Sequence, residues 1–180
     1  MKRRAWRGPV PLLVLAAIFA PSAILAAPPE PARFGPRDAP QVFSIAKSEN
    51  QNRVAYALRL DSRCSPAGDA PVAPYWRMLE KGPSATEPLL AREEAAYGIA
   101  SQSVNAGIVH VTLRALEGRP IAIEAHAVPG GCAATAWTRI GGVQAQLLEV
   151  FVQLSWPFGV RYIVLRGRAR DRAVEEIIER

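Results

Sequence analysis

Short segments rich in β-branched and aromatic residues recur along this chain from Gln41 onward, and turn residues separate them. Such segments predict strands, because these side chains suit a pleated, half-buried surface while Gly, Pro, Asn and Asp favour turns. A last run, Ala173 to Ile178, fits either a strand or a terminal helix. The other expected strands are Val42 to Ala46, Arg53 to Leu60, Pro74 to Leu79, Gly107 to Ala115, Ile121 to Val128, Ala133 to Ile140, Val143 to Ser155 and Val160 to Arg166.

One segment predicts a helix instead. Ser84 followed by Glu87 is a capping-box pattern, Pro88 lies in the first turn, and no β-branched residue follows before Gly98. We therefore expect one short helix at about residues 84–98. Three strands, this helix and then an antiparallel meander predict an α+β, mostly β domain, whose sheet curls into a barrel or a sandwich.

The first 26 residues predict a secretory signal peptide, with a basic start, an apolar run from Val10 to Ala20 and small residues at the end. The Arg3-Arg4 pair leaves the twin-arginine export route open. The apolar run is too short to span a bilayer, and no second one follows, so we expect no transmembrane segment in the mature protein. Residues 27–40 hold five prolines and predict an extended tether, and residues 41–180 predict a single globular domain, periplasmic or secreted.

The charge of the chain gives no indication of nucleic-acid binding. The formal net charge is +6, but four of the 22 Lys and Arg residues lie in the expected signal peptide, and the others nearly balance the 16 acidic residues. The late arginines between Arg161 and Arg172 are followed by Glu175, Glu176 and Glu179. We therefore expect a surface of mixed charge and no nucleic-acid partner.

The chain has two cysteines, Cys64 and Cys132, and both lie in turn-like contexts next to Pro or Gly. Export to an oxidising compartment favours a disulfide between them. Two free thiols are the alternative, because a sequence does not show the geometry that a disulfide needs. A metal site is less expected, since no His or carboxylate neighbours either cysteine at ligand spacing.

The two histidines lie in the hairpin expected between residues 107 and 128. Matching the polar faces of its strands predicts that His110 opposes His126 and that Thr112 opposes Glu124. Two imidazoles and a carboxylate would then meet, as in a two-His-one-carboxylate metal site or an acid–base pair. A solvated polar face gives the same alternation and is our preferred interpretation, so we expect no bound metal and no cofactor.

The stretch from Tyr75 to Gly82 combines two aromatic residues, a methionine and three charges. Alternation places Trp76 and Met78 on one face, so Glu80 would lie at the mouth of any cavity that they line. Our preferred interpretation is instead a set of core residues at a polar strand end. Glu80, Glu87, Glu93 and Glu94 could supply a carboxylate pair for glycoside hydrolysis, although charges around a surface helix more commonly serve solvation and capping.

Three runs carry a resemblance to a known family. They are the run from Phe43 to Tyr56, the run Tyr75-Trp-Arg-Met-Leu-Glu-Lys-Gly82, and the run Glu94-Ala-Ala-Tyr-Gly-Ile99. These runs resemble an uncharacterised family of exported bacterial proteins, a domain of unknown function, over roughly Val42 to Ile178. The resemblance implies a shared fold and no particular activity. The cysteines and the histidines are not part of the shared pattern.

Three functional hypotheses follow. The leading one is an exported, non-catalytic domain that binds a small molecule or an envelope component, at a pocket near Tyr56, Trp76, Glu80 and Tyr97. One alternative is a hydrolase that uses carboxylates or the face of His110, Glu124 and His126, although nucleophile signatures are missing from the sequence. A structural partner-binding sheet is the other, and an exposed apolar patch without a cavity would favour it.

Overall fold

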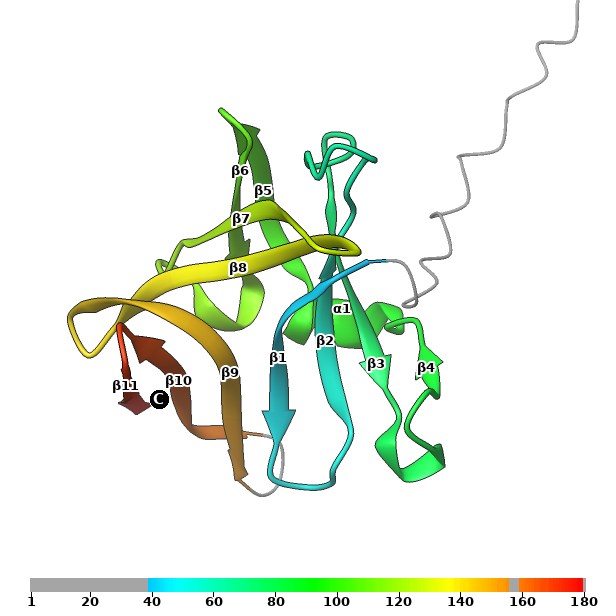
Figure 1. Ribbon diagram of the computed structural model, residues 1–180. Helices are drawn as coiled ribbons and strands as arrows, with labels where there is room; N and C mark the ends of the chain where they lie inside the picture. The colour runs from blue at the N-terminus through cyan, green and yellow to red at the C-terminus, as the bar shows by residue number, and fades with distance from the viewer. Residues whose placement is uncertain (1–38, 156–158, 180) are drawn as a thin grey trace, which may run out of the picture. The chain divides into compact units, whose positions relative to one another are not determined.

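The structure is a computed structural model that describes residues 39–155 and 159–179. The predicted signal peptide and nearly all of the predicted tether lie outside the described residues. The described chain forms an eleven-stranded mixed sheet with the strand order β4-β3-β2-β1-β9-β8-β7-β6-β5, and β10 and β11 extend from the other edge of β9 (Figure 1). The sheet is not closed, since β4 and β5 end its main path.

The strands follow the β-rich runs of the sequence closely. One α-helix, α1 (Ala91–Tyr97), and two short 3-10 helices, η1 (Leu79–Lys81) and η2 (Arg114–Leu116), interrupt them. The strands are β1 (Gln41–Lys47), β2 (Arg53–Leu58), β3 (Val72–Arg77), β4 (Thr86–Glu87), β5 (Ile99–Asn105), β6 (Ile108–Leu113), β7 (Ile121–Val128), β8 (Gly131–Ile140), β9 (Val143–Ser155), β10 (Gly159–Ala169) and β11 (Arg172–Glu179).

The expected fold class is confirmed: the domain is mostly β with one short helix. Strands β5 to β11 form an antiparallel meander in which each strand pairs with the next. The exception to antiparallel pairing is β1, which pairs in parallel with β9 through Ser44 to Lys47. Strand β9 thus pairs on one edge first with β8 and then with β1, and on its other edge with β10.

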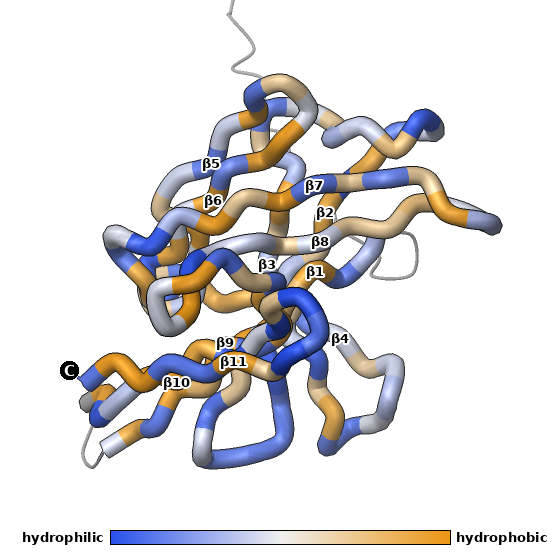
Figure 2. Tube along the Cα trace, turned by 60° about the vertical axis from the view of Figure 1, so that its left-hand side comes forward, coloured by the Kyte–Doolittle hydropathy of each residue, from blue (hydrophilic) through white to orange (hydrophobic). Residues whose placement is uncertain are grey.

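The main hydrophobic core lies on one face of the strands. Figure 2 shows hydrophobic and hydrophilic residues alternating along β6 and β7, as a sheet with one buried face requires. Val109, Val111, Ile121 and Ile123 accordingly lie in the main core cluster, while His110 on the opposite face is exposed. The run from Ala173 to Ile178 is a strand within β11, not a terminal helix.

The helix begins later than the sequence predicts. Thr86 and Glu87 pair with β3 as the short strand β4, so the expected capping box at Ser84 is wrong. The backbone N–H of Leu90 instead donates to Glu93 Oε2 at 2.8 Å, and the helix starts at Ala91. A carboxylate in the first turn satisfies a free N–H and favours this helix start.

The expected disulfide is confirmed. Cys64 lies in the loop between β2 and β3, and Cys132 lies near the start of β8. Their Cα atoms are 5.5 Å apart and the two sulfurs are bonded. The bond joins two residues that are 68 positions apart in the sequence. The segment between them contains every element from β3 to β7. Among the described residues, no helix has the length and the apolar character needed to cross a membrane.

Candidate functional site

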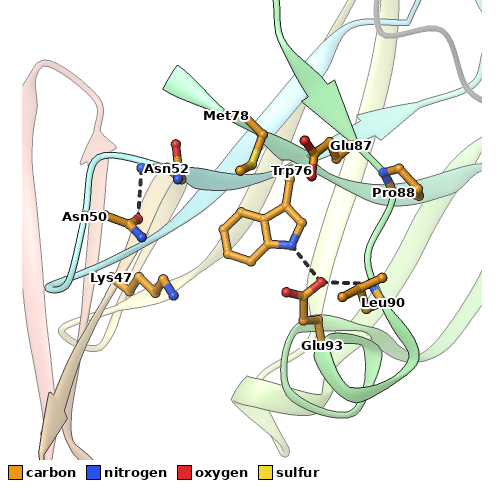
Figure 3. A pocket seen from close by; sticks show the side chains of 9 residues that line it. All are labelled: Lys47, Asn50, Asn52, Trp76, Met78, Glu87, Pro88, Leu90 and Glu93. Atoms are coloured by element: carbon orange, nitrogen blue, oxygen red, sulfur yellow. Dashed lines mark hydrogen bonds between the residues drawn. The ribbon is translucent and has the colours of Figure 1, made fainter. Parts of the chain in front are cut away.

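A hollow of about 480 Å³ lies between the β1–β2 turn and the segment that leads into α1 (Figure 3). Trp76 from β3 lies at its centre, and Met78 follows on the same side. Alternation along β3 explains the pair, because Tyr75 faces the opposite side of the sheet with Ala55 and Ala57. Trp76 is only 8% exposed and lies in the main core cluster, and Met78 packs against that cluster, so both are core residues that also line the hollow.

Three contacts fix the indole of Trp76. Its Nε1 donates to Glu93 Oε2 at 2.9 Å, the Tyr97 ring packs edge-on with centroids 5.7 Å apart, and Lys47 Nζ lies 5.5 Å from the ring centroid. Burial raises the pKa of Glu93, but hydrogen bonds from the Leu90 N–H and from Trp76 together with the charges of Arg92 and Lys47 lower it more, so the net pKa lies below the usual value. Glu93 is therefore a carboxylate at neutral pH.

The hollow has two walls of different chemistry (Figure 3). Lys47, Asn50 and Asn52 lie on one side of Trp76, and the carboxylates of Glu87 and Glu93 lie on the other. Each charged wall already holds one weak surface ion pair, Lys47 with Glu49 at 3.0 Å and Glu87 with Lys81 at 2.5 Å. Exposed pairs of this kind contribute about 0–1 kcal/mol, so an incoming ion can replace them.

Asn52 holds the β1–β2 turn in place. Its side chain is buried and exchanges two hydrogen bonds with Glu80, donating to Glu80 Oε2 at 3.2 Å and accepting from the Glu80 N–H at 3.3 Å. The Asn52 N–H donates to Asn50 Oδ1 at 3.1 Å. Asn50 Nδ2 and Glu93 Oε1 have no hydrogen-bond partner within residues 39–155 and 159–179, so both are available to a ligand.

The four residues expected around a pocket have different positions. Trp76 lines the hollow, Tyr97 supports Trp76, and Glu80 contacts the hollow only through Asn52. Tyr56 is fully buried, stacks on Phe43 with centroids 4.5 Å apart and donates to the backbone oxygen of Tyr97. Burial raises the pKa of Tyr56 far above its usual value, so its hydroxyl remains a neutral donor in the core.

The expected pairing of His110 with His126 is wrong. His110 faces Ala122 and Val111 faces Ile121, so the register differs by four residues. The reason is the connection after Leu113, which turns inward as η2 and buries Leu116 instead of extending the hairpin. Alternation still places both histidines on one face, but His126 lies four positions along β7 from Ala122, roughly 13 Å away.

In this register the three residues considered as metal ligands, His110, Glu124 and His126, also lie apart from one another. Glu124 lies two positions from Ala122 along β7, and His126 pairs with Ala133 of β8. Within the part of the chain that the structure describes, no three His, Cys, Asp or Glu side chains are grouped so that they could hold a metal ion. The two-His-one-carboxylate arrangement is therefore not assembled by His110, Glu124 and His126.

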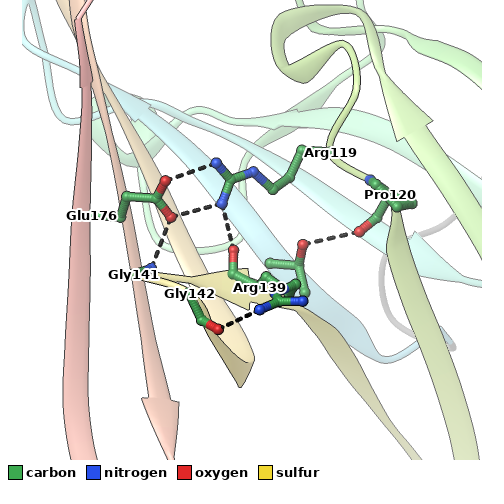
Figure 4. A network of polar contacts seen from close by, with 7 residues as sticks. Arg119, Pro120, Arg139, Gly141, Gly142 and Glu176 are labelled. Atoms are coloured by element: carbon green, nitrogen blue, oxygen red, sulfur yellow. Dashed lines mark hydrogen bonds and ion pairs between the residues drawn. The ribbon is translucent and has the colours of Figure 1, made fainter.

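A second hollow, of about 650 Å³, lies over β6, β7 and β8 and reaches β11. One end is closed by a network around Glu176 (Figure 4). Arg119 donates to both oxygens of Glu176 at 2.6 and 2.7 Å, and the Gly141 N–H donates to Glu176 Oε2 at 2.8 Å. The bonds from Arg119 lower the pKa of Glu176, burial opposes this, and the net pKa lies below the usual value.

Comparison with known protein families gives a match over most of the chain. A family model described as "Domain of unknown function (DUF4833)" matches residues 43–180, most of the chain. No curated protein matches the chain. No solved structure matches it either.

Proposed function

This chain belongs to the DUF4833 family of domains of unknown function, and we propose that it is a non-catalytic binding domain of the cell envelope whose Trp76 hollow takes a small zwitterionic molecule. Free amino acids and short peptides are the simplest ligands of this class. The observation that carries the proposal is the placement of a cationic wall and an anionic wall on opposite sides of one indole.

Each end of such a ligand has a matching group. A ligand carboxylate fits the wall with the Lys47 ammonium and the free Asn50 Nδ2, and a ligand ammonium fits the carboxylates of Glu87 and Glu93. Charge-assisted hydrogen bonds of this type are about twice as strong as neutral ones. Because Glu93 stays ionised at neutral pH, both walls are charged under ordinary conditions.

The part of the hollow between the walls suits an apolar side chain. Leu90, which is 53% exposed, Met78 and the small accessible part of Trp76 supply apolar surface there. A volume of about 480 Å³ lies within the range of small-molecule sites. A few polar groups at fixed positions around an apolar floor are typical of a binding pocket.

The other hypotheses have less support. The hydrolase hypothesis used carboxylates or the face of His110, Glu124 and His126. The register separates the members of that face, and Glu93, one of the two carboxylates in the Trp76 hollow, already accepts from Trp76 Nε1 and the Leu90 N–H. The partner-binding sheet hypothesis expected an apolar patch with no cavity, whereas two hollows indent the described surface. The geometry therefore favours a ligand-binding domain.

The zwitterion proposal predicts that free dipeptides with an apolar side chain raise the melting temperature, and that the same dipeptides with acetylated and amidated ends do not. A ligand at 100 times its Kd adds about 2.7 kcal/mol of stability, a shift that thermal denaturation resolves easily. Lys47→Met keeps the packing on Trp76 but removes the ammonium, so it should weaken binding about tenfold, equivalent to 1.4 kcal/mol.

Arg172→Met is the matched control, because it removes one positive charge from an exposed residue of β11 that does not line the hollow. Its affinity for free dipeptides should equal that of the unmodified protein by isothermal titration calorimetry. Equal shifts from free and blocked dipeptides, or equal loss of affinity in Lys47→Met and Arg172→Met, would contradict recognition of a zwitterion.

We further propose that the domain works outside the cytoplasm after removal of residues 1–26, with residues 27–40 as a tether. The basic and apolar leader supports export. The disulfide between Cys64 and Cys132 is compatible with an oxidising compartment. Cells that express the full chain should yield a protein whose intact mass begins near Ala27, and recovery of the chain with Met1 still attached would refute the proposal.

A further inference from the structure

We propose that the hollow over β6, β7 and β8 is a second binding site, separate from the Trp76 hollow, which takes a neutral sugar ring stacked on Trp137. The site lies on the outer face of the sheet, opposite the core residues Val109, Ile123 and Ala136. Figure 1 shows the three strands side by side.

The pairing of β6, β7 and β8 leaves a slot between two ring side chains. His110 of β6 faces Ala122 of β7, and Ala122 faces Trp137 of β8, so a single methyl group separates two ring side chains. Neighbouring strands lie about 4.8 Å apart, so the two rings start from positions roughly 10 Å apart. All three residues line the hollow, and Trp137 is only partly buried. One face of the indole can therefore receive a flat or chair-shaped ring.

The slot also contains polar groups that the protein leaves unused. Within the described chain, the His110 imidazole, the Trp137 indole N–H and the Gln144 amide form no hydrogen bond, and all three line the hollow. Together they offer donors and acceptors at several positions around the ring space. A sugar hydroxyl both donates and accepts, so it can pair with each of them.

The charged lining residues favour an uncharged ligand. Arg119 is already paired with both oxygens of Glu176, whereas Arg139 donates one N–H to the backbone oxygen of Gly142 at 2.7 Å. Glu176 in turn accepts from Arg119 and from the Gly141 N–H. A phosphate or carboxylate ligand would have to compete with Glu176 for Arg119, whereas a neutral sugar leaves this ion pair intact.

An indole suits the apolar side of a sugar. The C–H groups on one face of a pyranose carry small positive charge, and the face of an indole carries negative charge in its quadrupole. Trp137 provides this surface at the solvent-facing side of a rigid sheet, which needs little ordering on binding. The combination of one stacking ring and several neutral polar groups is what identifies the ligand class.

The test uses three soluble probes, maltohexaose, cellohexaose and chitohexaose, with the mature protein. We expect at least one of them to bind at millimolar concentration or below and to move the indole N–H resonance of Trp137 in a ¹H–¹⁵N NMR spectrum. The resonance is assigned by its loss in Trp137→Phe. Trp137→Ala should weaken binding at least about tenfold, and Ala122→Leu, which fills the slot but keeps the indole, should weaken it similarly.

Thr135→Ala is the matched control, because Thr135 lies two residues before Trp137 on the same strand face and does not line the hollow. It should bind as the unmodified protein does, and so should Lys47→Met, which alters only the Trp76 hollow. No binding by any of the three sugars would overturn the proposal. Binding that either Trp137→Ala or Ala122→Leu leaves unchanged would overturn it as well.

Discussion

Replacing both Cys64 and Cys132 with alanine should lower the free energy of unfolding by about 4 kcal/mol, the largest effect expected from removing any single bond in this domain. The bridge closes a loop with a sequence separation of 68 residues, and closing a long loop removes much of the freedom of the unfolded chain. For a domain of this size, such a loss corresponds to a fall in melting temperature of roughly 8–16 °C.

Reduced wild-type protein is the control for this prediction. It should melt at the same temperature as the double variant, because both lack the bond and differ little in packing. Cys64→Ala alone should leave one reactive thiol on Cys132. Two titratable thiols per chain in denatured, unreduced protein would show that the bond is absent from the protein in solution.

Gly167→Ala should be the most damaging single methyl addition on β10. An alanine Cβ at this position would lie 2.2 Å from the backbone oxygen of Gln146 and 2.6 Å from Ile140 Cδ1. The backbones approach this closely because the β9–β10 ladder shifts register between Arg166 and Gly167. We expect a loss of about 3 kcal/mol, since the backbone of β9 must move to remove the contact.

Two further variants separate the causes of this loss of stability. Arg168→Ala, at the exposed next residue, should change the stability by less than about 0.5 kcal/mol in urea unfolding. Adding Ile140→Val to Gly167→Ala removes the side-chain contact only, so it should restore little of the lost stability. A fully stable Gly167→Ala protein would mean that β9 and β10 are farther apart than the structure places them.

Local sequence patterns were sufficient to locate most strands. The expected strand Val143 to Ser155 coincides with β9, because a long β-rich run ends at a Trp-Pro pair. Strand β5 was missed, since its sequence Ile-Ala-Ser-Gln-Ser-Val-Asn is polar and has few β-branched residues. Its place at the edge of the sheet explains this composition, because an edge strand buries little surface.

Patterns that depend on distant contacts were beyond a local analysis. The predicted hairpin register was wrong because burial of Leu116 shortens the pairing of β6 with β7. That burial depends on packing across the whole core. The predicted helix start was wrong because Thr86 and Glu87 pair with β3 as a short strand. In both cases tertiary packing overrode a local preference.

The candidate site was predicted only in part, because it also depends on contacts between segments that are distant in the sequence. Trp76 was identified from alternation within one strand, which is a local signal. Lys47 and Glu93 come from β1 and α1, and only the folded sheet brings them to opposite sides of the indole. The polar turn after β1, with Asn50 and Asn52, is the one sequence signal that could have indicated the cationic wall.

The parallel pairing of β1 with β9 determines when the domain can finish folding. Ser44 and Glu149 lie about a hundred residues apart, so β1 and the hairpin it forms with β2 gain their central neighbour only when β9 has been made. Pairings between such distant segments form slowly, because the chain between them must first be ordered. A newly made chain therefore remains without its central strand pair during most of synthesis, and the sheet can be completed only after β9 has been made.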